Sequence, residues 1–148
     1  MPILRENLRP IAGQMLDELE KIFGDAKATD AQRLSAANAI ADYAARDFGK
    51  LSQLLTVATA EQFNVLYPLV AAAPTPAIAT DLGKIAATLP EEELGTVARV
   101  GFGQRRADAA VTLLRLGERE SVLPVFDLTD DPEALTQFIF RCRDRGVR

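Results

Sequence analysis

Apolar residues recur at helical spacing along nearly the whole chain. Ala107, Ala110, Val111 and Leu114 stand at positions i, i+3, i+4 and i+7, which form one face of an α-helix. No long stretch alternates apolar with polar residues, and no Asn-Gly or Asp-Gly pair marks a β-hairpin. The pattern therefore predicts an all-α protein.

Caps and helix breakers divide this pattern into separate elements. Thr29 with Gln32, and Thr59 with Gln62, match the signature of a helix start in which two side chains cap each other's backbone. We expect Pro68 to kink its helix and expect Gly117 to end another. The predicted helices cover about 11–23, 30–44, 48–57, 60–70, 77–89, 90–98, 105–116, 122–126 and 132–142, with the last capped by Asp131 and begun by Pro132.

The pattern of residues 33–66 recurs in residues 106–138, at an offset of 72–73 positions. The matched pairs include Ala36/Ala109, Ala37/Ala110, Ile40/Leu113, Tyr43/Leu116, Leu51/Leu123, Leu54/Phe126, Phe63/Leu135 and Leu66/Phe138. Helical pairs on this scale are typical of HEAT, armadillo and TPR repeats, which bury their apolar faces by stacking. We therefore expect a HEAT/TPR-like α-solenoid of about three to four stacked antiparallel helix pairs. It would form a single domain over residues 1–148, with a lead-in at 1–10 and possible units at about 29–66, 67–101 and 102–141.

Composition excludes several classes of function. The chain of 148 residues is 48% hydrophobic and 26% charged, as is typical of a soluble globular domain. It contains no histidine, which removes Ser-His-Asp and Cys-His catalysis and histidine-ligated zinc. The net charge of −4 argues against nucleic acid, and prolines interrupt the longest uncharged run, Gln62–Thr80, so we expect no membrane span. A single cysteine fits a cytoplasmic protein, and we expect no cofactor or metal.

The remaining candidates for chemistry have simpler structural interpretations. Gly101-Phe102-Gly103 lacks the third glycine and the preceding strand of a dinucleotide loop, so it predicts a helix break. The acidic groups Glu91–Glu93 and Asp130–Asp131 stand at predicted helix starts, where carboxylates suit the helix dipole. Cys142 falls on the apolar stripe Leu135-Phe138-Ile139-Cys142 and is expected in the core. The tail Arg141–Arg148 is expected to be a frayed helix end, and no catalytic residue is assigned.

One stretch carries a family resemblance. The run Arg105–Gly117, RRADAAVTLLRLG, resembles a HEAT-like helical module of large bacterial proteins that also carry serine/threonine kinase and formylglycine-generating-enzyme-like (sulfatase-modifying) domains. Further matches, in the same order, are Val122-Leu123-Pro124, Asp131-Pro132, Phe138–Arg141 and Arg145-Gly146-Val147, with Arg33-Leu34, Ala41–Ala44 and Glu61-Gln62-Phe63 upstream. The family pattern implies a histidine where Phe140 stands. The chain shows no kinase loops and no metal-ligand set, so neither enzymatic activity carries over.

These observations predict a non-enzymatic protein-interaction or scaffold module whose partner is another protein or protein domain. Two alternatives stay open. The chain is a structural spacer of a larger kinase or formylglycine-generating-enzyme-like protein, or it is a regulatory or protease-target protein in a bacterial signalling or defence system. We expect the partner to meet exposed basic side chains of the third unit, namely Arg99, Arg105, Arg106, Arg115 and Arg119.

Overall fold

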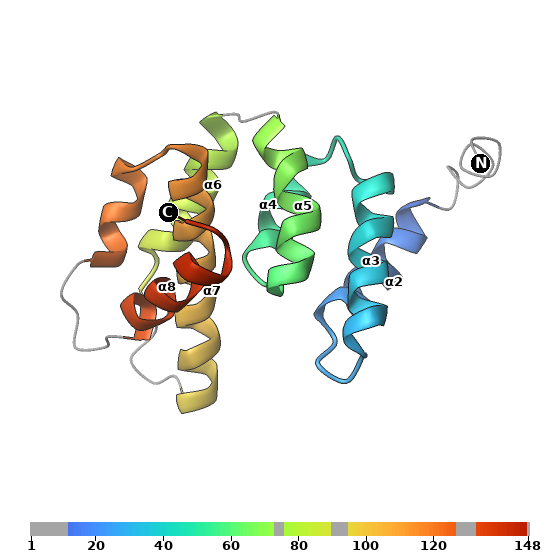
Figure 1. The fold of residues 1–148 in the computed structure, drawn as a ribbon, viewed down its shortest axis with the longest axis horizontal. Coiled ribbons are helices and arrows are strands. Elements are labelled where there is room, and N and C mark those ends of the chain that lie inside the picture. Colours follow the sequence, from blue (N-terminus) through green and yellow to red (C-terminus); the bar gives the residue numbers. More distant parts are fainter. Residues whose placement is uncertain (1–11, 73–75, 90–94, 127–132, 148) are drawn as a thin grey trace.

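A computed structural model describes residues 12–72, 76–89, 95–126 and 133–147, and within these ranges every regular element is helical (Figure 1). The elements are α2 (Ala12–Gly24), α3 (Asp30–Tyr43), α4 (Phe48–Leu55), α5 (Ala60–Ala72), α6 (Pro76–Ala87), α7 (Thr96–Leu116), the 3-10 helix η2 (Glu120–Phe126) and α8 (Glu133–Asp144). The described part of the chain contains no strand, which confirms the all-α prediction. None of its helices is long and apolar enough to cross a membrane.

Several helix ends lie where the capping residues and glycine in the sequence predicted them. Thr29 and Gln32 form the predicted capping box at the start of α3. At α5, the Thr59 backbone N–H donates to Gln62 Oε1 at 2.8 Å, and the Gln62 N–H donates to Thr59 Oγ1 at 3.3 Å. Gly117 ends α7 with a φ of 89°, a left-handed conformation that glycine adopts without strain. The starts predicted at Pro90 and at Asp131-Pro132 lie outside the described residues.

The expected helix break near Phe102 is wrong, because α7 runs without interruption through Gly101 and Gly103. Each helical glycine costs about 1 kcal/mol relative to alanine. Packing of α7 along α6 offsets this cost, and it includes a hydrogen bond from Arg106 Nε to the Ala86 carbonyl at 2.9 Å. The predicted boundary between the second and third units falls inside this helix. Helix α5 contains Pro68 in its interior, where the sequence placed it.

The elements succeed one another across the molecule, from α2 and α3 at one end to α6, α7 and η2 at the other, and α8 lies across α7 (Figure 1). Helix α2 packs on α3, α3 on α5, α4 on α5 and α6, α6 on α7, and α7 on η2 and α8. A single cluster of buried apolar side chains extends through these contacts, and its members include Phe23, Ile40, Leu51, Leu66, Leu113 and Phe138. The core is therefore elongated, and each part of it depends on neighbouring elements.

Candidate interaction surface

The structure separates the five predicted partner-binding arginines. Arg105 and Arg119 are exposed, whereas Arg99 and Arg115 are half-buried. Arg106 is only 5% exposed. The expectation that all five offer free guanidinium groups is therefore wrong for Arg106.

Arg106 is buried where its side chain donates a hydrogen bond to the C-terminal end of α6. Ala86 lies in the last turn of α6, where backbone carbonyls have no partner within the helix. Arg106 Nε donates to this carbonyl, so a side chain that the sequence assigned to the surface joins α7 to α6 instead.

Arg115 is held against the aromatic face of α5. Its guanidinium carbon lies 3.8 Å from the centroid of the Tyr67 ring, and Tyr67 Oη donates to the Arg115 carbonyl at 2.9 Å. Phe63 stacks on Tyr67, with centroids 5.3 Å apart and ring planes 11° apart. A cation over an aromatic face contributes about 0.5–2 kcal/mol, so Arg115 has a structural role between α7 and α5.

A buried cluster of charges was missed by the sequence reasoning. The Asp108 side chain is only 2% exposed. Its Oδ1 accepts a hydrogen bond from Arg145 Nε at 2.9 Å and also lies 2.7 Å from Arg145 Nη2. Arg141 Nε lies 2.8 Å from the same oxygen, although its N–H is not aligned for a hydrogen bond. Arg145 also donates to the carbonyls of Ala58 at 2.7 Å and Thr59 at 3.3 Å. We call Asp108, Arg141 and Arg145 the Asp108 cluster.

The same contacts overturn the expectation of a frayed tail. The Val147 N–H donates to the Cys142 carbonyl at 2.9 Å, and Gly146 has a φ of 68°. This is the glycine-containing motif that commonly closes a helix end, and it holds Arg145, which is 4% exposed, in place. The tail is therefore ordered as far as Val147.

Two signals in the sequence could have revealed the cluster. Asp108 is a lone acid inside the apolar run Ala107–Leu114, and a buried charge requires a partner. Arg141 and Arg145 stand four positions apart and so share one face near the end of the last helix. Neither signal predicts that the segment containing Asp108 contacts the segment containing Arg141 and Arg145.

Burial changes the acid–base behaviour of two groups in this region. Burial raises the pKa of the Asp108 carboxyl group above its ordinary value, while Arg145 and Arg141 partly oppose that rise. Burial also raises the pKa of the Cys142 thiol. Cys142 is half-buried and packs against the core, which agrees with the expectation of a core residue rather than a reactive thiolate.

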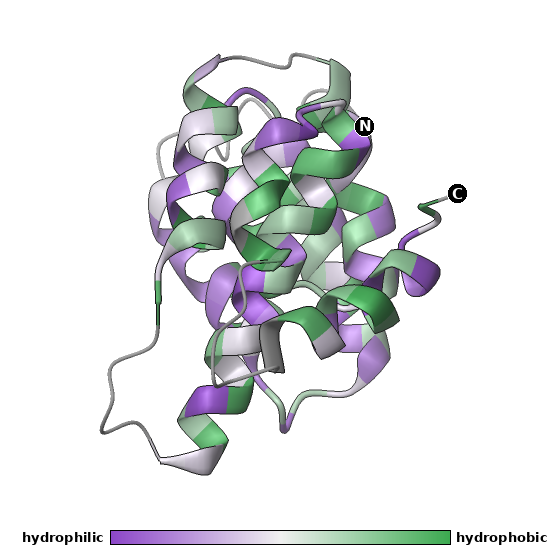
Figure 2. Ribbon diagram, turned by 90° about the vertical axis from the view of Figure 1, so that its left-hand side faces the viewer, coloured by the Kyte–Doolittle hydropathy of each residue, from purple (hydrophilic) through white to green (hydrophobic). Residues whose placement is uncertain are grey.

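The elements η2 and α8 both expose large apolar side chains. Leu123 and Phe126 on η2 are 61% and 49% exposed, and Ile139 and Phe140 on α8 are 62% and 63% exposed. The two elements contact each other, and the Phe126 ring meets Phe138 edge-on at 5.3 Å. We call Leu123, Phe126, Ile139 and Phe140 the η2–α8 apolar surface. Figure 2 views the molecule from the side on which η2 lies, with residues coloured by hydropathy.

The apolar stripe predicted for the last helix is wrong at Ile139, because this side chain is exposed. Phe138, Arg141 and Arg145 are spaced i, i+3 and i+7, and they share the face that contains the Asp108 contacts. This rotation of α8 buries Phe138 and leaves Ile139 in solvent. The position of the buried carboxylate, rather than hydrophobicity alone, fixes which side of α8 points inward.

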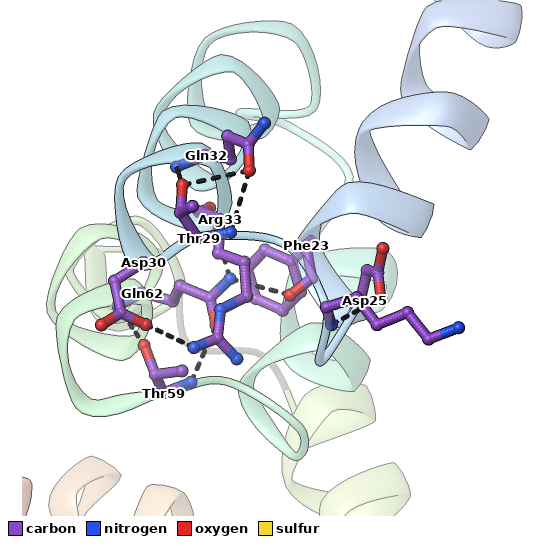
Figure 3. A network of polar contacts seen from close by, with 9 residues as sticks. Phe23, Asp25, Thr29, Asp30, Gln32, Arg33, Thr59 and Gln62 are labelled. Atoms are coloured by element: carbon purple, nitrogen blue, oxygen red, sulfur yellow. Dashed lines mark hydrogen bonds and ion pairs between the residues drawn. The ribbon is translucent and has the colours of Figure 1, made fainter.

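A second buried polar network lies next to the Asp108 cluster, and the two meet at Thr59 (Figure 3). Gln62, which is 1% exposed, donates from Nε2 to the carbonyls of Phe23 at 3.0 Å and Arg33 at 3.3 Å. Its Oε1 caps α5 through the Thr59 N–H, as described above. Gln62 therefore connects α2, α3 and α5. Asp30 forms an ion pair with Arg33 beside it.

The surface of the described residues also contains two open grooves of similar size. One, of about 630 Å³, lies between α2 and α3, and its lining includes Leu19, Ile22, Ala28 and Ala31. The other, of about 620 Å³, lies beside α6 and η2, and its lining includes Pro76, Ala79, Gly83, Leu116 and Ser121. The described residues contain no group of three or more His, Cys, Asp or Glu side chains able to hold a metal ion.

No family model, no curated protein and no solved structure significantly matches this chain. Its function is therefore inferred from its own surfaces.

Proposed function

We propose that this chain is a non-enzymatic protein-interaction module that binds another protein through the η2–α8 apolar surface. One observation carries the proposal. Among the described residues, four of the eight large hydrophobic side chains that are exposed lie on these two adjacent elements. Grouped apolar side chains in water mark sites of protein association more often than scattered ones do.

The helix contacts support a HEAT-like α-solenoid as the scaffold for this surface. Sequential helices pair as α2 with α3, α4 with α5 and α6 with α7, and adjacent pairs meet through α3–α5 and α4–α6 contacts. Such nearest-neighbour packing is typical of stacked helical repeats. In this arrangement η2 lies beside the last pair, and α8 packs across α7 with its C-terminal end at the α4–α5 connection.

Exposed arginines flank the proposed binding surface. Arg119 immediately precedes η2, and Arg143 lies in the last turn of α8, with both side chains exposed. Protein interfaces often combine an apolar centre with a polar rim in which arginine is enriched. Of the arginines predicted from sequence, Arg119 therefore belongs to this surface, whereas Arg106 and Arg115 have structural roles.

A capture experiment with a matched control tests the proposal. The double variant Ile139→Ser/Phe140→Ser removes half of the surface, and Val97→Ser removes an apolar side chain that is 88% exposed at the start of α7. We expect the tagged wild type and Val97→Ser to retain the same specific protein from a host lysate, at matched concentrations. The double variant should retain about tenfold less, a change that corresponds to about 1.4 kcal/mol. Equal capture by all three folded proteins would count against this surface.

A further inference from the structure

We draw no further inference here: the strongest candidate, the open apolar groove of about 630 Å³ between α2 and α3 that Leu19, Ile22 and Ala31 help to line, carries none because nothing in the structure shows what covers it.

Discussion

Two buried networks that meet at Thr59 satisfy backbone carbonyls in different ways. Around α2–α5 the connecting group is the neutral amide of Gln62, which reaches Phe23, 39 residues away in sequence. Around α7–α8 it is the guanidinium of Arg145, which reaches Ala58, 87 residues away, and is paired with Asp108. Each side chain joins three segments of the chain.

The difference between the two networks concerns what happens when they are perturbed. A neutral amide network loses individual hydrogen bonds when it is disrupted. An ionic network that loses one partner leaves a buried charge, which is far more costly. The network around Gln62 should also be insensitive to pH, whereas the one around Arg145 contains a titratable carboxyl group.

Arg145→Met should produce the largest loss of stability. The variant leaves Asp108 without its principal partner and leaves the carbonyls of Ala58 and Thr59 without these donors. Removal of one member of a buried ion pair typically costs about 3–5 kcal/mol. Urea unfolding followed by circular dichroism measures the loss, and Arg143→Met, at an exposed position, provides the control. A loss no larger than that of the control would mean that the ionic network resembles a surface ion pair.

Gln62→Met should destabilise the protein less than Arg145→Met does. It removes the donor to the Phe23 and Arg33 carbonyls and the acceptor for the Thr59 N–H, but it leaves no buried charge. We expect a loss of about 2–3 kcal/mol, from the unsatisfied buried groups. The matched control is Gln53→Met, at an exposed position of α4. If Gln62→Met proved as destabilising as Arg145→Met, charge would not be what distinguishes the two networks.

The two networks should also differ in how the free energy of unfolding depends on pH. This effect is smaller than the losses above but more specific. Because burial raises the pKa of Asp108, the folded state binds its proton more tightly than the unfolded state does. The contribution of this carboxyl group is fully present below its unfolded pKa of about 3.9, and it declines as pH rises through its folded pKa. The difference in unfolding free energy between wild type and Asp108→Asn should therefore fall as pH rises from about that value. The difference in unfolding free energy between wild type and Gln62→Met should not change with pH. A difference between wild type and Asp108→Asn that rises with pH would contradict the prediction.

Cys142 offers the mildest test, because it reports on α8 without a destabilising substitution. Burial raises the pKa of its thiol, so the reactive thiolate is scarcer in the folded protein. We expect iodoacetamide to react with native Cys142 more slowly than with the urea-unfolded chain at the same pH. Arg145→Met should accelerate the native reaction, whereas Gln62→Met, which leaves the contacts between Asp108 and Arg145 in place, should accelerate it less. Equal acceleration by both would indicate that the two networks are strongly coupled through Thr59.

Sequence reasoning succeeded where the determining interactions are local. The capping pairs Thr29/Gln32 and Thr59/Gln62 lie three residues apart, and Gly117 closes α7 through its own conformation. Such features depend on a single turn of backbone, so the residues that form them are neighbours in the sequence. The all-α class follows for the same reason, since helical periodicity is also a local property.

Tertiary structure alone decided which side chains these helices bury. Periodicity identifies residues that share a face, but the neighbouring element determines which face points inward. Packing on α6 carries α7 through two glycines and buries Arg106, and the carboxylate of Asp108 turns Arg141 and Arg145 inward and Ile139 outward. Asp108 and Arg145 are 37 residues apart, and no local pattern connects them. The sequence by itself thus determined the helices and most of their described ends, whereas the Asp108 cluster and the exposed apolar surface arise only when α7, η2 and α8 pack together.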